Sequence, residues 1–172
     1  LIFVSEAFLN ISKASIVNNF GPILGIKRAT VFISNSIIQN NKANIDDLIY
    51  VVQGSFLYIN NSICQHNTKP KNIIFSSSSN IFIEKSKFSS NIADQENIKG
   101  VKSSEISIFR STISSNIGHF IIAAVELSVL IIEDSHILHS YSQYGFLVSR
   151  SKLTVKQSYF VDNAYIFYIQ EN

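Results

Sequence analysis

The stretch IEKSKFSSNIA at Ile83–Ala93 decides the fold, because its skeleton returns along the chain. It reappears as IFRSTISSNIG at Ile108–Gly118 and as VKQSYFVDNAY at Val155–Tyr165. In each copy an aliphatic residue is followed three positions later by Ser, five later by Phe or Ile, and eight later by Asn. Recurrence at a fixed spacing indicates a repeat architecture.

The same register runs through seven units, which follow one another at intervals of 22 to 26 residues, about 24 on average. Within each unit apolar residues occupy alternate positions, as along a strand with one buried face, and no segment shows the helical period of about 3.6. A second apolar segment follows in every unit. The expected second strands are Ile23–Ile26, Leu48–Val51, Ile73–Phe75, Lys99–Val101, Ile121–Val125, Phe146–Val148 and Ile166–Ile169.

Neither strand of a unit can bury its apolar face alone, and no helical segment is available to cover it. Stacking equivalent strands in parallel buries both faces and pairs the backbone. The sequence therefore predicts an all-β fold, a right-handed parallel β-helix of about seven coils of about 24 residues, the hand following from the chirality of parallel crossovers. We expect residues 1–172 to form a single segment of a longer solenoid, without a linker or second domain. An antiparallel sandwich is the alternative, but it does not require the same residue at the same register in every unit.

The marker Ser and the Asn five positions after it are expected to be structural. In a stacked coil each lies above its equivalent, where Asn can hydrogen-bond the next coil and tolerate a left-handed backbone. A catalytic group would be needed in one coil only, beside unlike partners. The predicted ladder residues are Ser36, Ser62, Ser86, Ser111, Ser135, Ser158, Asn19, Asn41, Asn67, Asn91, Asn116 and Asn163, with Ala14 and Ser140 as conservative exceptions.

Four short segments carry a resemblance to a known family. FSSN (Phe88–Asn91), ISSN (Ile113–Asn116), FVDN (Phe160–Asn163) and CQHN (Cys64–Asn67) resemble the Phe-x-x-Asn element of polymorphic outer membrane protein repeats, which belong with the pectin-lyase-like right-handed β-helices. The resemblance covers nearly the whole chain. It implies a binding or structural role in a large surface or adhesin-like protein, so an extracellular or cell-surface location is favoured.

Composition narrows the possible partners. The net charge of +2 is spread along the chain without a basic run, which argues against a nucleic acid partner. The longest apolar stretch, Phe120–Ile132, is too short to span a bilayer and contains Glu126, so no membrane-spanning segment is expected.

The single cysteine, Cys64, falls at an inward position and is expected to be an unreactive core thiol. The four histidines share no register in adjacent coils, so neither a metal site nor a cofactor is expected.

One outward position is aromatic in three consecutive coils. Phe32, Tyr58 and Phe82 stand there, with Phe56 on the same face. Stacked exposed aromatic residues form an apolar strip, which usually marks a partner surface, and aromatic rows also stack on sugar rings. These three residues are therefore the candidate contacts for a protein or glycan partner. Two alternatives stay open: the strip packs beneath the rest of a larger parent chain, or the chain is an internal scaffold of a large assembly.

A catalytic β-helix acting on polysaccharide, as a lyase or hydrolase, is the other alternative. Its active site would be built around Glu84, Arg110, Glu133 and Asp134, which lie outward in neighbouring coils. Glu84 and Glu133 would stand two coils apart, at about 10 Å, the edge of the range for an inverting pair. A surface ladder of charges explains the same residues. The sequence thus favours a non-enzymatic role and assigns no catalytic residue.

Overall fold

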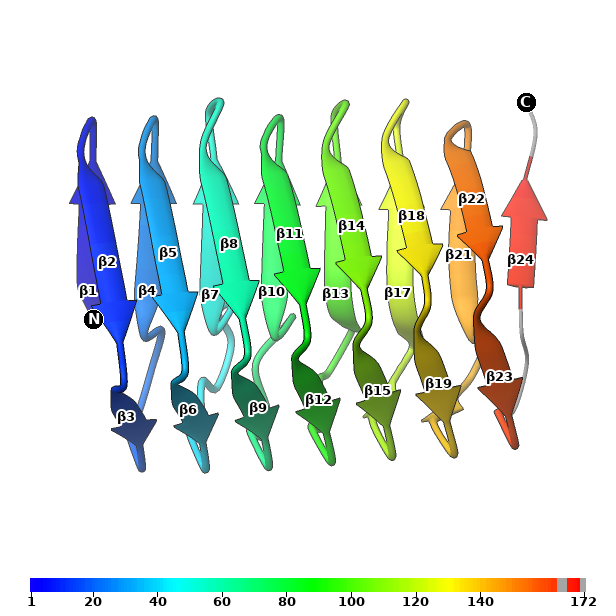
Figure 1. Cartoon of the computed structure of the whole chain (residues 1–172), viewed down its shortest axis with the longest axis horizontal. Coiled ribbons are helices and arrows are strands. Elements are labelled where there is room, and N and C mark those ends of the chain that lie inside the picture. Colours follow the sequence, from blue (N-terminus) through cyan, green and yellow to red (C-terminus); the bar gives the residue numbers. More distant parts are fainter. Residues whose placement is uncertain (164–166, 171–172) are drawn as a thin grey trace.

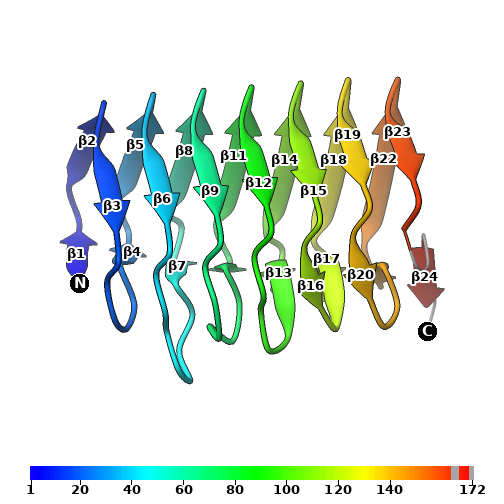
Figure 2. The same cartoon turned by 90° about the horizontal axis from the view of Figure 1, so that it is seen from below.

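The structure is a computed structural model that describes residues 1–163 and 167–170. These residues contain no helix, and their strands coil seven times around one axis and begin an eighth turn (Figure 1). In Figure 1 the front strands run downward and the back strands upward while the chain advances from left to right, and Figure 2 shows the same sense from below. The winding is therefore right-handed, and the predicted fold class is confirmed.

Three parallel sheets form the walls of the solenoid. The first sheet contains β1 (Ile2–Ser5), β4 (Leu24–Lys27), β7 (Ile49–Val52), β10 (Ile74–Ser77), β13 (Glu96–Val101), β17 (Phe120–Val125), β21 (Phe146–Ser149) and β24 (Phe167–Gln170). The middle sheet contains β2 (Phe8–Ser12), β5 (Thr30–Ser34), β8 (Phe56–Asn60), β11 (Asn80–Glu84), β14 (Glu105–Phe109), β18 (Val129–Glu133) and β22 (Lys152–Lys156). The third sheet contains β3 (Ser15–Val17), β6 (Ile37–Gln39), β9 (Ile63–Gln65), β12 (Lys87–Ser89), β15 (Thr112–Ser114), β19 (His136–Leu138) and β23 (Tyr159–Val161). A short fourth sheet pairs β16 (Ile117–Gly118) with β20 (Tyr141–Ser142).

The strands pair in the register of the sequence repeat. Ile83 lies between Ile59 and Ile108 in the middle sheet, and Phe88 lies between Cys64 and Ile113 in the third sheet. The strand pairs that the structure describes are parallel throughout, so the antiparallel sandwich is wrong. The expected second strands correspond to the first sheet, with ends shifted by up to three residues: β13 already begins at Glu96, which pairs with Phe120. Ile166, the first residue of the last expected strand, lies outside the described residues.

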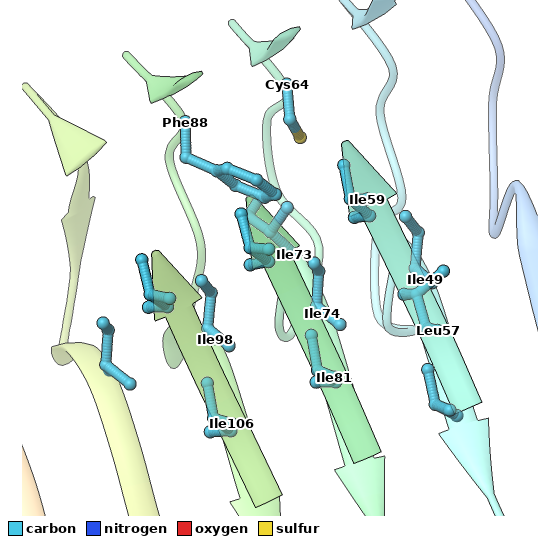
Figure 3. Packing of buried hydrophobic residues seen from close by; sticks show 14 of the residues in the cluster. Ile49, Leu57, Ile59, Cys64, Ile73, Ile74, Ile81, Phe88, Ile98 and Ile106 are labelled. Carbon is cyan, nitrogen blue, oxygen red and sulfur yellow. The ribbon is translucent and has the colours of Figure 1, made fainter. Parts of the chain in front are cut away.

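The interior is filled by the inward side chains of all three sheets. Figure 3 shows Ile59 and Ile81 of the middle sheet, Ile74 of the first and Phe88 of the third sharing this core. Full burial of an Ile side chain contributes about 1.5–3 kcal/mol, so the repetition of Ile at inward positions supplies most of the driving force. Cys64 takes an inward position in this core with 2% of its surface exposed, as expected.

The Asn residues form a continuous ladder of side-chain hydrogen bonds. Asn91 Oδ1 accepts from both the backbone N–H and the side-chain Nδ2 of Asn67, at 3.1 and 2.9 Å, and its own Nδ2 donates to Cys64 O. The same double contact joins Asn19 to Asn41, Asn41 to Asn67, and Asn91 to Asn116. The left-handed backbone lies one residue earlier, as at Ser90 with φ of 54°, so the ladder Asn itself is not the left-handed residue.

The marker Ser residues form a second ladder at the corner between the middle and third sheets. Ser86 Oγ accepts from the backbone N–H of Ser62 and donates to Glu84 O, two residues before it. Equivalent bonds to the preceding coil are accepted by Ser36, Ser62, Ser111, Ser135 and Ser158. Each Oγ therefore satisfies one backbone donor and one backbone acceptor at a buried corner.

A third ladder was not predicted. It lies between the first and middle sheets and is made by Ser55, Ser79, Ser104, Ser128 and Ser151. Its signal was present in the sequence, because a Ser or Ala stands seven positions before each marker residue. All three corners of the solenoid are therefore closed by small polar side chains that bond from one coil to the next.

Candidate binding surface

The outward face of the middle sheet carries a row of five aromatic rings. The structure places Phe32, Tyr58 and Phe82 in one register, at the centre of β5, β8 and β11. Phe8 extends the row at one end and Phe109 at the other, and we call these five residues the aromatic row. Successive ring centroids lie 5.4, 5.4, 5.0 and 5.0 Å apart. The middle sheet is the front layer in Figure 1, and strand labels β2 to β14 mark the extent of the row.

The two added rings were missed because they belong to other registers. Phe8 is the first residue of β2 and pairs with Thr30, while Phe109 is the last residue of β14 and pairs with Glu84. Each ring reaches its neighbour diagonally across the strand pair, a distance that aromatic side chains can bridge. The residues found at one position of the repeat do not reveal a row that crosses to other positions.

The rings differ in how they meet one another. Phe82 stacks on both Tyr58 and Phe109 with interplanar angles of 25°. Phe32 is tilted by 39° against Phe8 and by 60° against Tyr58. The rings of β8, β11 and β14 thus cover each other's faces, whereas those of β2 and β5 do not.

An open groove runs beside the less stacked end of the row. Its lining residues are Phe8, Asn10, Phe32, Ser34, Tyr58 and Asn60, and its volume is about 380 Å³. All six side chains point outward from β2, β5 and β8, the strands of three consecutive coils. The groove therefore combines three aromatic rings with two amides and a hydroxyl.

Glu84 forms the polar centre of the face. The hydroxyl of Tyr58 and the amide Nδ2 of Asn60 both donate to Glu84 Oε2, at 2.5 and 3.1 Å. Arg110 donates to Oε1, and Lys85 Nζ lies 3.9 Å from the same oxygen. The hydrogen bond from Tyr58, followed by the charge of Arg110, lowers the pKa of Glu84. Burial, followed by the hydrogen bond to Glu84, raises the pKa of Tyr58.

The structure pairs both glutamates of the catalytic alternative with cations. Glu84 and Glu133 lie in one register with the ring of Phe109 between them, and Glu133 pairs with Lys156 at 4.0 Å. The pKa of Glu84 is lowered, so this carboxyl does not suit the role of general acid in a glycosidase, which needs a raised pKa. Asp134 and Arg110 occupy left-handed corner positions, with φ of 49° and 47°. Arg110 nevertheless reaches the carboxylate of Glu84 and forms an ion pair with it.

The rest of the described chain adds two observations. Within residues 1–163 and 167–170, no three His, Cys, Asp or Glu side chains gather as a metal site would require. The same part of the chain holds no helix long and apolar enough to cross a membrane.

Comparison with known proteins does not assign a family. No family model matches the chain, and no curated protein matches it. Among solved structures, the surface protein and adhesin PfbA of Streptococcus pneumoniae is similar over 90% of this chain and 78% of that chain, with 9% sequence identity and a TM-score of 0.18. Similarity at this level carries no functional argument. The chain is a parallel β-solenoid, and its resemblance to polymorphic outer membrane protein repeats rests on the short segments of its sequence.

Proposed function

We propose that the chain is a non-enzymatic binding module of a larger surface or extracellular protein, and that it holds a glycan against the outward face of the middle sheet. Phe32, Tyr58 and Phe82 are the proposed contacts. The observation that supports the proposal is the aromatic row beside an open groove with amide and hydroxyl groups. Rings supply apolar contact area, and amides bond to hydroxyl groups, which together suit the two kinds of surface on a sugar.

The scaffold beneath the row favours binding without rearrangement. The strands that carry Phe32, Tyr58 and Phe82 are paired on both sides, and their inward side chains are buried, as at Ile59 and Ile83. A surface that is already in its bound shape loses little conformational entropy when a ligand binds. A protein partner, or coverage by the rest of a larger parent chain, is the alternative occupant of the same rings.

A glycan array tests the proposal. We expect the wild-type chain to bind, and a Phe32→Ala, Tyr58→Ala, Phe82→Ala triple variant to lose binding. The matched control is Phe75→Ala, which removes a half-buried outward ring from the first sheet. Circular dichroism of each variant checks that the solenoid remains folded. The proposal is wrong if the wild type binds no glycan, or if the triple variant binds as well as the wild type does.

A further inference from the structure

Two cations from neighbouring coils meet at one carboxylate beside the aromatic row. Arg110 donates to Glu84 Oε1, and Lys85 Nζ lies 3.9 Å from the same oxygen. The other oxygen, Oε2, accepts hydrogen bonds from Tyr58 and Asn60. Glu84 thus keeps the two cations close together, while its single negative charge offsets only one of their two positive charges.

Both cations are accessible to a ligand. Lys85 and Arg110 have 56% and 57% of their side-chain surface exposed, whereas Glu84 between them has 13% exposed. They follow β11 and β14, which are paired with another strand on each side, so the exposure belongs to inner coils of the solenoid. Lys87, the first residue of β12, is also exposed, and it forms no ion pair with the residues that the structure describes. This corner therefore carries an excess of positive charge.

The neighbouring corner residues decide the direction in which a ligand can extend. Lys85 and Arg110 belong to a column of left-handed residues, one in each coil, between the middle and third sheets. The next coil places Asp134 in this column, and the two preceding coils place Asn61 and Asn35 there. Asp134 repels an anion. An anionic ligand therefore extends from the two cations toward the amides of Asn61 and Asn35.

From these observations we infer that the glycan is acidic: a carboxylate or sulfate group binds between Lys85 and Arg110, and hydroxyl groups of the adjoining sugars bond to the amides of Asn61 and Asn35. A guanidinium has five N–H donors and an ammonium three, so both cations keep donors for an anion after they contact Glu84. Hydrogen bonds between charged groups are roughly twice as strong as neutral ones. The inference rests on the proposed function and makes it more specific, because it names the class of glycan and adds two contacts beside the aromatic row.

Biolayer interferometry of the full chain on immobilised polymers tests the inference. The probes are hyaluronate, which carries carboxylates, dextran sulfate, which carries sulfates, neutral dextran, and polyglutamate, an anionic polymer without sugars. We expect hyaluronate or dextran sulfate to bind more tightly than either dextran or polyglutamate, and the binding to weaken as salt is added. The preference between the two acidic polysaccharides identifies the anionic group.

Variants of the two cations locate the site. Lys85→Gln should weaken binding to the better acidic polysaccharide about fivefold, and Arg110→Gln at least as much, through the loss of a charge-assisted contact. The matched control is Lys102→Gln, which removes the same charge from an exposed left-handed residue at the corner between the first and middle sheets. It should leave the affinity within a factor of about two. Glu84 keeps three other partners in Lys85→Gln, so this variant retains the fold, and a thermal unfolding curve verifies this.

The inference is overturned if Lys102→Gln weakens binding as much as Lys85→Gln does. It is also overturned if dextran or polyglutamate binds as tightly as the acidic polysaccharides. If neither acidic polysaccharide binds while the glycan array is positive, the inference alone fails. If the array is negative as well, the proposed function fails.

Discussion

Tyr58 and Glu84 lie on neighbouring strands, and the hydroxyl of Tyr58 donates a 2.5 Å hydrogen bond to Glu84 Oε2. This bond joins the aromatic row to the ion pair that Glu84 forms with Arg110. The carboxylate has 13% of its side-chain surface exposed, so its charge is stabilised chiefly by these partners. The bond both orients the ring of Tyr58 and lowers the pKa of Glu84.

Replacing Tyr58 by Phe should therefore destabilise the solenoid in a pH-dependent way. The ring and its stacking on Phe82 remain, but the bond to the carboxylate is lost, at a cost of about 1 kcal/mol at neutral pH. Because the folded pKa of Glu84 is lowered, its stabilising contribution is present above the ordinary pKa of a carboxyl, about 4.3, and is lost as the pH falls through the folded value. Urea unfolding of both proteins at several pH values measures the difference. A difference that stays constant down to acidic pH would show that the carboxylate is not involved.

Asn91 should be far more sensitive to substitution than its equivalent in the last coil. Asn91→Ala removes the acceptor of two donors of Asn67 and leaves them buried, which costs about 3 kcal/mol. Asn91→Asp keeps the shape but places a charge in the core and should destabilise at least as strongly at neutral pH. Asn163→Ala is the control: at a half-buried site it removes the acceptor of one donor, the backbone N–H of Ser140, and the bond that Asn163 Nδ2 donates to Ile137 O, and it should cost about 1 kcal/mol. Equal losses at the two positions, measured by chemical denaturation, would contradict the ladder as a source of stability.

Cys64 should be inert in the folded chain. Burial raises the pKa of its thiol to about 12, and only 2% of its surface is exposed. The thiolate, which is the reactive form, is therefore rare at pH 8 and inaccessible to reagent. We expect a chromogenic disulfide reagent to label Cys64 only after denaturant is added. Fast stoichiometric labelling of the native protein would mean that this part of the core opens readily.

Gly25 should resist substitution because of Tyr50. A Cβ at Gly25 would collide with the ring carbon Cζ and the hydroxyl of Tyr50, so Gly25→Ala must shift the outer end of that side chain, which offsets the gain from Ala. In a Tyr50→Ala background the same change should become stabilising by about 0.5–1 kcal/mol, since Ala suits a strand better than Gly does. A double-mutant cycle by thermal or urea unfolding gives the coupling between the two sites. An absence of coupling would show that the ring does not press on Gly25.

The fold was largely predictable, because every coil has the same pattern of alternating apolar residues to bury. Ile83 and Phe88 were assigned to the core from alternation alone, and both are buried by the paired strands on each side. The Asn ladder was predictable for the same reason, since equivalent residues in a parallel stack must lie above one another. The first-sheet strand at Glu96 was predicted too short, because polar residues at its start hid its pairing with the next coil.

The candidate binding surface was predictable only in part. Three rings at one register were visible in the sequence as Phe32, Tyr58 and Phe82. The ring of Phe109 and the pairing of Arg110 with Glu84 depend on the direction in which each side chain leans from its strand. The spacing of residues does not predict that direction, because packing among the outward side chains determines which diagonal contacts form.

By itself, the sequence determined the repeat, the inward residues and the corner ladders, since a period of two along each strand and about 24 along the chain leaves one parallel stack that buries them all. Only the tertiary structure decided which outward side chains meet. It continued the aromatic row to Phe8 and Phe109 and stacked the rings of Tyr58, Phe82 and Phe109 on one another. The physical reason is that inward positions are fixed by burial, whereas outward positions are fixed by contacts among side chains from different coils.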